Sequence, residues 1–247
     1  MVGKLVFLKI CGIALDESIS RDAIVTDLKI LARSRPNDLF YAICGGGKPV
    51  DSLRELFDLD PNQVCQDWQE RSGKVASPAE AAHWLALGIM DERAAMMQKE
   101  CQGVENIFFP PVTRLLMERE GHLPRSWEVT SDSITYWLAV ALACDPGFPV
   151  IVLLKNIDGV IKMQPTRAGV PRRSRDVQGK IVRRILVHRG HPHPRLPSYP
   201  FDEYLFGLVD EFQQPFHVVH WQHLDRLIDI LEKGAEAHST KVMPIAL

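Results

Sequence analysis

The chain has 247 residues, of which 46% are hydrophobic and 24% are charged, a composition typical of a globular protein with a substantial core. Its formal net charge of −2 argues against a general attraction to nucleic acid or to an anionic membrane surface. No apolar run is long enough to span a bilayer, and the N-terminal stretch is interpreted as a first strand rather than a signal peptide.

The five cysteines are scattered along the chain, and none forms a Cys-x-x-Cys pair. This arrangement argues against a disulfide framework and against a structural zinc site. It favours reduced thiols in a cytoplasmic protein.

Segments typical of strands and of helices alternate along the chain. Apolar and β-branched runs predict strands at 4–10, 39–44, 104–111, 148–160 (ending in a turn) and 216–221. Helical spacing, caps and N-terminal prolines predict helices at 20–34, 49–59, 77–101, 131–143 and 224–234. In the longest of these, Ser77 and Glu80 have the spacing of a capping box. The alternation predicts an α/β protein with a mainly parallel sheet.

Three loops follow predicted strands, where a parallel sheet binds its ligands: "KICGIAL", "CGGGKPVD" and "LKNIDGV". The glycines Gly45, Gly46 and Gly47 either form a plain turn or let an anion approach bare N–H groups near a helix N-terminus. The coincidence of three such loops favours a phosphate-binding sheet.

Residues 162–200 interrupt the alternation with sequence rich in Arg, Pro, Gly and His. This region is interpreted either as a solvated loop or as a basic lid over an anionic ligand. Its histidines, His188, His191 and His193, lack partners at a familiar metal-ligand spacing, so no metal site is predicted there.

Four stretches, in the same order along the chain, resemble the amino acid kinases, a family that includes acetylglutamate, aspartate and uridylate kinases. They are "VFLKICGIALD", "AICGGGKPVDSL", "WEVTSDSITYWLA" and "VIVLLKNIDGVIK". The branch of (aminomethyl)furanyl-methyl phosphate kinases of methanofuran biosynthesis, with its bacterial relatives, fits best. The resemblance implies a three-layer αβα sandwich with the amino acid kinase (carbamate kinase-like) fold. It also implies a single domain over 1–247, with an acceptor-side lobe (1–145) and a nucleotide-side lobe (146–247) that carries the insert at 162–200.

The same resemblance implies an enzyme, an ATP-dependent kinase with Mg²⁺ bound alongside the nucleotide. The acceptor would be a phosphate or a carboxylate, as on the aminomethylfuran phosphate of methanofuran-type cofactor synthesis. The implied partners are small molecules and further copies of the chain in a homo-oligomer. The alternatives are a non-catalytic relative that binds a nucleotide or an anion, and a kinase for an amino acid or a nucleotide.

Site residues follow from the matching motifs. Lys9 matches the lysine that contacts the transferred phosphoryl group, and Asp132 matches the aspartate that organises the site. Phosphate and acceptor would be bound by Gly12, Gly45, Gly46, Gly47 and Ser131. The nucleotide would be bound by Lys155, Asp158 and Gly159. Structural alternatives remain for several of these: a strand lysine extended at the sheet edge, an aspartate at the N-cap or in the first turn of a helix, and a plain Asp-Gly turn.

The chain departs from the family pattern near the expected phosphoryl path. Cys11 stands where the family has a glycine, and Ile13 stands where it commonly has a serine. The added side chain either reshapes the site or abolishes turnover. No residue matches the second catalytic lysine of acetylglutamate kinases, and an arginine of the insert or Lys180 is the candidate for that charge. Trp127 and His83 lie beside matching stretches and are assigned to packing.

Overall fold

A mainly parallel sheet forms the centre of the computed structural model, which describes residues 3–119, 123–143, 149–157, 184–187, 202–233 and 240–244. Within these residues the strand order is β3-β2-β1-β4-β6-β7-β5. The strands are β1 (Leu5–Ile10), β2 (Leu39–Cys44), β3 (Ile107–Phe108), β4 (Val150–Lys155), β5 (Arg184–Val187), β6 (Phe216–His220) and β7 (Thr240–Pro244). Only β6 and β7 pair antiparallel among these neighbours.

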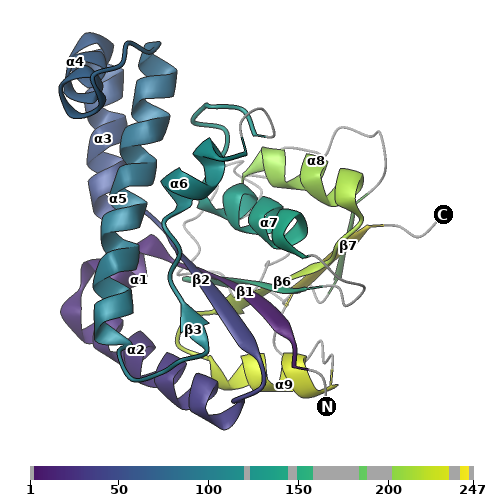
Figure 1. The fold of residues 1–247 in the computed structure, drawn as a ribbon. Coiled ribbons are helices and arrows are strands. Elements are labelled where there is room, and N and C mark those ends of the chain that lie inside the picture. Colours follow the sequence, from purple (N-terminus) through teal and green to yellow (C-terminus); the bar gives the residue numbers. More distant parts are fainter. Residues whose placement is uncertain are drawn as a thin grey trace, which may run out of the picture.

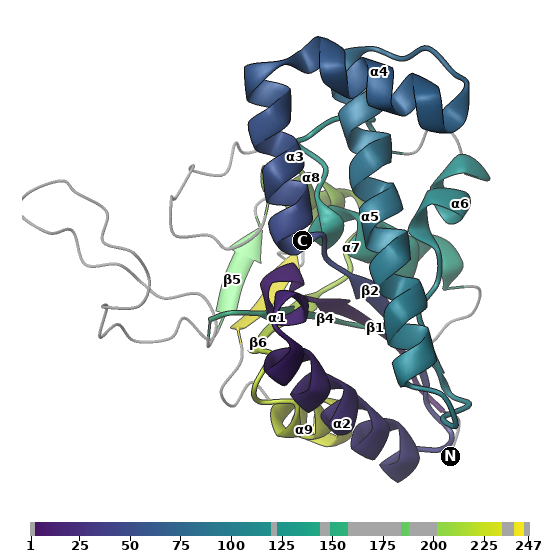
Figure 2. The same cartoon turned by 90° about the vertical axis from the view of Figure 1, so that its left-hand side faces the viewer.

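Helices cover both faces of the sheet, as Figures 1 and 2 show, with α7 and α8 on one face and α2 and α9 on the other. The helices are α1 (Gly12–Asp16), α2 (Ser18–Ser34), α3 (Gly47–Leu59), α4 (Pro61–Ser72), α5 (Pro78–Glu100), α6 (Val112–Met117), α7 (Ser131–Leu142), α8 (Glu203–Phe212) and α9 (Asp225–Lys233). The expected three-layer αβα sandwich is therefore confirmed. None of the described helices is both long and apolar enough to cross a membrane.

Helix α5 joins the two layers of helices. Its start follows the sequence prediction, because the Ser77 hydroxyl accepts a hydrogen bond from the Glu80 N–H at 3.3 Å and Pro78 is the first helical residue. The first half of α5, with Leu87, packs in the core that contains α7 and α8. The last turns, with Met97, pack in the core that contains α2 and α9.

Six described elements were not predicted from the sequence: α1, α4, α6, α8, β5 and β7. Helix α4 was not predicted because it is mostly polar, with only Val64 and Trp68 buried along its length. Its N-terminus is capped by Asp60. Helix α8 was also not predicted. Strand β7, which follows α9, was not predicted either. Strand β5 lies within the insert, and the rest of 162–200 lies outside the described residues.

Strand alternation places the side chains that matter for the site. In β1, Val6, Leu8 and Ile10 face the core under α2, and Phe7 faces the core under α7. Lys9 shares the face of Phe7 because it lies two residues further along. In β4, Leu153 faces the α7 side, so Lys155 does as well. Both lysines therefore stand at the carboxyl ends of adjacent strands, on the face that α7 covers.

Candidate active site

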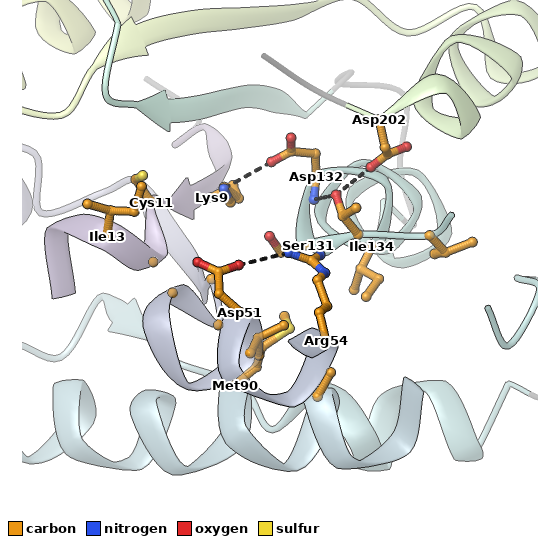
Figure 3. Close-up of a pocket in the computed structure, with 18 of the residues that line it drawn as sticks. Lys9, Cys11, Ile13, Asp51, Arg54, Met90, Ser131, Asp132, Ile134 and Asp202 are labelled. Carbon is orange, nitrogen blue, oxygen red and sulfur yellow. Dashed lines mark hydrogen bonds and ion pairs between the residues drawn. The ribbon is translucent and has the colours of Figure 1, made fainter. Parts of the chain in front are cut away.

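A pocket of about 620 Å³ opens at the carboxyl ends of β1, β2 and β4, between α3, α5 and the start of α7 (Figure 3). Glycines of both loops, two residues at the start of α7 and both strand lysines line it. The sequence-predicted residues that it brings together are Lys9, Gly12, Gly45, Gly46, Gly47, Ser131, Asp132 and Lys155. Asn156 and Ile157 continue this wall, and the predicted nucleotide-binding residues Asp158 and Gly159 lie outside the described residues.

Two lysines share one buried carboxylate at the inner end of the pocket. Lys9 Nζ lies 3.1 Å from Asp132 Oδ1, and Lys155 Nζ donates a hydrogen bond to Asp132 Oδ2. The exposed fractions are 6% for Lys9, 2% for Asp132 and 9% for Lys155. Two ammonium groups and one carboxylate leave a surplus of one positive charge, so the cluster is suited to bind an anion.

Burial and attraction compete in setting the three pKa values. Burial alone would lower the pKa of Lys9, but the field of Asp132 outweighs it and the pKa is raised. Burial, together with repulsion from Lys9, lowers the pKa of Lys155 to about 8 against the pull of Asp132. The two lysines hold the pKa of Asp132 below its usual range although burial opposes this. Both lysines are therefore mostly charged at neutral pH.

The start of α7 fixes the position of Asp132. Thr130 is the N-cap, and its hydroxyl oxygen accepts a hydrogen bond from the Asp132 N–H at 3.3 Å. Asp132 is therefore not the N-cap but an acid in the first turn of α7, the other form of the structural alternative, which is compatible with a functional role. As the second residue of the helix, Asp132 keeps its carboxylate free for the two lysines. The positive end of the α7 dipole adds to its stabilisation.

Asp202, at the N-cap of α8, is a pocket residue that the sequence analysis missed. Its carboxylate accepts hydrogen bonds from the hydroxyls of Thr130 and Ser133 and from the Leu205 N–H. Asp202 thus connects the start of α8 to the start of α7 through the two residues that flank Ser131 and Asp132. Its sequence context, an acid just before a helix, indicates only a cap, since the partners are far away along the chain.

The glycine loops pack directly against each other. A Cβ atom on Gly12 would lie 2.2 Å from the Gly47 nitrogen, and one on Gly45 would lie 2.8 Å from the Gly12 nitrogen. Gly47 also has a positive φ of 60°. These glycines therefore have a packing reason that requires no ligand, and this same contact brings the N-termini of α1 and α3 together at the pocket.

Arg93, on α5, connects the two glycine loops through hydrogen bonds and an ion pair. Its guanidinium donates to the Gly12 carbonyl at 2.8 Å and pairs with Asp16. The Asp16 carboxylate in turn accepts the Lys48 N–H at 3.0 Å. One buried ion pair thus connects the first loop, the second loop and α5.

Cys11 lies at the edge of the pocket and is 7% exposed. Its φ of −59° and ψ of 125° are accessible to any amino acid, so the backbone does not require glycine there. Ile13 is also a lining residue and is more exposed, at 53%.

Trp127, which packs against the core, and the buried His83 both line the pocket. His83 is buried, with Nδ1 3.2 Å from the Ser126 carbonyl, and burial lowers the pKa of its ring. The Trp127 ring packs edge-on against Phe57 at 5.7 Å. The guanidinium of Arg54, a residue without a role in the sequence analysis, lies 5.4 Å from the centre of the Trp127 ring.

The same fold occurs in solved kinase structures. The UMP kinase of Bacillus anthracis superposes with a TM-score of 0.61 and 16% identity over 97% of this chain and 96% of that chain. The uridylate kinase of Archaeoglobus fulgidus gives 0.59 and 13% over 97% and 99% of the two chains. The aspartate kinase of Synechocystis gives 0.57 and 12% over 98% of this chain and 40% of that one.

The chain thus has the fold of the amino acid kinases, which confirms the fold expected from the motifs. No protein-family model and no curated protein sequence matches it. At these identities the likeness establishes the fold alone.

Proposed function

We propose that the protein is a kinase that transfers the γ-phosphoryl group of ATP to a phosphate or carboxylate of a small metabolite. The observation that carries this proposal is the pair of buried lysines on Asp132, which leaves one surplus positive charge between the glycine loops and the end of β4. The fold shared with UMP kinases and an aspartate kinase supports it.

Phosphoryl transfer requires mainly placement of the two reactants and stabilisation of charge on the group in transfer. In the proposed mechanism, Lys9 binds an oxygen of the transferred phosphoryl group from the β1 side. Lys155 binds it from the β4 side and provides the second cation, for which no motif match was found. Asp132 touches neither reactant and keeps both ammonium groups in position. The Gly45 N–H donates to the Ile10 carbonyl at 2.9 Å. The N–H groups of Gly12, Gly46 and Gly47 face charge that develops on the equatorial oxygens.

The remaining nucleotide contacts in this proposal come from Asp158 and Gly159, after β4, and Ser131 contributes to the acceptor side. Mg²⁺ bound to the nucleotide phosphates would neutralise part of their charge. The described residues contain no cluster of three or more His, Cys, Asp or Glu side chains that could hold a metal by themselves.

The specific acceptor within this proposal is (aminomethyl)furanyl-methyl phosphate, in methanofuran-type C1-cofactor synthesis. Transfer to its phosphate would produce a diphosphate. An amino acid or a nucleotide is the alternative acceptor. A non-catalytic nucleotide-binding protein is the second candidate function, favoured by Cys11, whose side chain lines the pocket beside the lysines. Catalysis remains the first proposal because Cys11 leaves the Lys9–Asp132–Lys155 cluster intact.

The test combines ATP binding with acceptor-dependent ADP release. Calorimetry should show that ATP with Mg²⁺ binds the purified chain, and that Lys9→Met weakens the binding at least about tenfold. Lys99→Met removes an exposed lysine at the far end of α5 and should leave the affinity unchanged. ADP release should rise when the furan phosphate is added. Well-folded protein that binds no ATP would overturn the proposal, and binding without ADP release for any acceptor would favour the non-catalytic candidate.

A further inference from the structure

The wall of the pocket away from the lysines is mostly apolar. Helix α5 contributes His83, Ala86, Leu87 and Met90, which recur at the spacing of one helix face. The opposite side adds Trp127, Val129 and Ile134. Burial lowers the pKa of the His83 ring and outweighs the hydrogen bond to the Ser126 carbonyl, which raises it, so the ring is neutral at physiological pH. This wall suits the body of a ligand that carries few hydrogen-bonding groups.

Arg54 is the other cation on the described lining, besides the two lysines. It lies on α3 seven positions after Gly47, which is about 10 Å along the helix axis. Figure 3 shows its side chain directed from α3 toward Ser131, above the α5 wall. Its guanidinium therefore faces the part of the pocket beside Ser131, next to Asp132, where the anionic group of an acceptor would reach it.

The present contacts of Arg54 leave it available to a ligand. Its guanidinium pairs with Asp51 at 3.0 Å, a half-exposed pair one turn apart, and such pairs contribute little to stability. The Trp127 ring orients the guanidinium from one face. Because the guanidinium has five donors in a planar fork, it can keep one of these contacts while it binds a phosphate or carboxylate in a bidentate manner.

Trp127 offers a second unused group. Its indole Nε1 is buried and has no hydrogen-bond acceptor among the residues that the structure describes. A buried indole N–H usually finds a partner, and an anionic or carbonyl oxygen beside Arg54 would supply one. The ring itself offers a flat apolar surface.

From these features we propose that the acceptor has a compact apolar or aromatic body with an anionic group, and that Arg54 and Trp127 select it. This proposal rests on the proposed function, because it names the acceptor class for the same pocket. Arg54 binds the anionic group, and the α5 wall holds the body. A nucleoside monophosphate fits this wall poorly, because the edges of its base and its sugar hydroxyls would lose water without gaining partners.

The experiment measures binding by calorimetry to the full chain without nucleotide. The probes are benzyl phosphate, phenylacetate, inorganic phosphate, uridine monophosphate and aspartate. Benzyl phosphate or phenylacetate should bind most tightly, and the order of these two identifies the anion. Benzyl phosphate should also exceed inorganic phosphate, because only the former places an apolar body on the wall. Tighter binding of uridine monophosphate or aspartate, or no binding of either aromatic probe, would overturn the acceptor class.

Arg54→Ala should weaken the preferred aromatic probe at least about tenfold, the loss expected for one charge-assisted hydrogen bond. Arg54→Lys, which keeps the charge without the fork, should recover part of the affinity and guards against misfolding of the alanine variant. Unchanged affinity in Arg54→Ala would refute the role of Arg54.

Arg125→Ala is the matched control. Arg125 also lies over a tryptophan ring, 5.2 Å from the centre of Trp84, and pairs with Glu80, but it does not line the pocket. Its side chain is 39% exposed, compared with 45% for Arg54. Probe affinity should not change in this variant, and an equal loss in both variants would contradict the proposal. ATP binding should persist in Arg54→Ala, so failure of this inference is distinguishable from failure of the kinase proposal, in which ATP does not bind.

Discussion

Lys9 and Lys155, on the adjacent strands β1 and β4, project from the same face of the sheet and share one carboxylate, that of Asp132. The two ammonium groups are nevertheless unequal. The pKa of Lys9 is raised, whereas burial and repulsion lower the pKa of Lys155 to about 8. The surplus charge of the site is therefore the one that Lys155 loses first when the pH rises.

Anion binding should weaken as the pH rises through the pKa of Lys155. We expect the affinity for ATP with Mg²⁺ to fall above about pH 8, by up to about tenfold per pH unit once the free site has lost its proton. Calorimetry between about pH 7 and pH 10 measures this. Lys155→Met should bind more weakly throughout, with a flat profile. A wild-type profile as flat as that of the variant would refute the role of Lys155.

The same pKa sets the sign of a stability effect. The pKa of Lys155 is about 8 in the folded protein, whereas an unperturbed lysine, as in the unfolded chain, has a pKa of 10.5, so the unfolded state binds more protons between these values. The contribution of Lys155 to the free energy of unfolding should therefore increase as the pH rises through this window. Urea unfolding of the wild type and Lys155→Met at both ends of the window isolates the contribution. It should shrink or vanish in the variant.

Removal of the shared carboxylate should cost far more stability than removal of one lysine. Asp132→Asn leaves two buried ammonium groups without a counter-charge, and we expect the free energy of unfolding to fall by about 3 kcal/mol or more. Lys155→Met leaves a neutral Lys9–Asp132 pair and should change it by no more than about 1 kcal/mol. Urea unfolding at neutral pH compares the two. Equal destabilisation would show that the cluster is not organised around Asp132.

The layers of the fold could be predicted from the sequence because the local spacing of apolar residues and the helix caps indicate strands and helices. The strands at 4–10 and 39–44 and the capped helix from Pro78 are examples that the structure confirms. Helix α4 escaped because a polar helix that buries only Val64 and Trp68 has almost no apolar periodicity. Strand β7 escaped because its pairing with β6 and β5 is determined by neighbours in space.

The residues of the candidate site also fall into those that the sequence indicates and those that only the fold reveals. Lys9, Asp132 and Lys155 could each be selected from motifs, but their meeting depends on the register of β1 with β4 and on the docking of α7 across both strands. Asp202 and Arg54 carry no local signal of function, because one reads as a helix cap and the other as a surface arginine. The glycines were expected to let a ligand approach the backbone. The structure adds that they also let the two loops pack against each other.

Replacement of Cys11 by glycine separates an active kinase from a non-catalytic relative. The backbone at Cys11 fits any residue, so Cys11→Gly should lower the free energy of unfolding by about 0.5–1 kcal/mol through greater freedom of the unfolded chain. We expect acceptor-dependent ADP release in the wild type, within a few-fold of that in the variant. Cys101→Ala, at a buried thiol away from the pocket, is the control. ADP release by the glycine variant alone would identify the wild type as non-catalytic.

Contact between the two glycine loops predicts opposite effects for two glycine-to-alanine changes. In Gly12→Ala the new methyl group meets the Gly47 nitrogen at 2.2 Å, so the loops must separate, and we expect a loss of about 1–3 kcal/mol in the free energy of unfolding together with weaker ATP binding. In Gly88→Ala, on α5, the methyl group meets nothing within 4 Å, and the helix should gain up to about 1 kcal/mol with ATP affinity unchanged. Urea unfolding and calorimetry on both variants measure this difference. Wild-type stability and affinity in Gly12→Ala would mean that the loops do not touch in solution, and the packing account of the glycines would then fail.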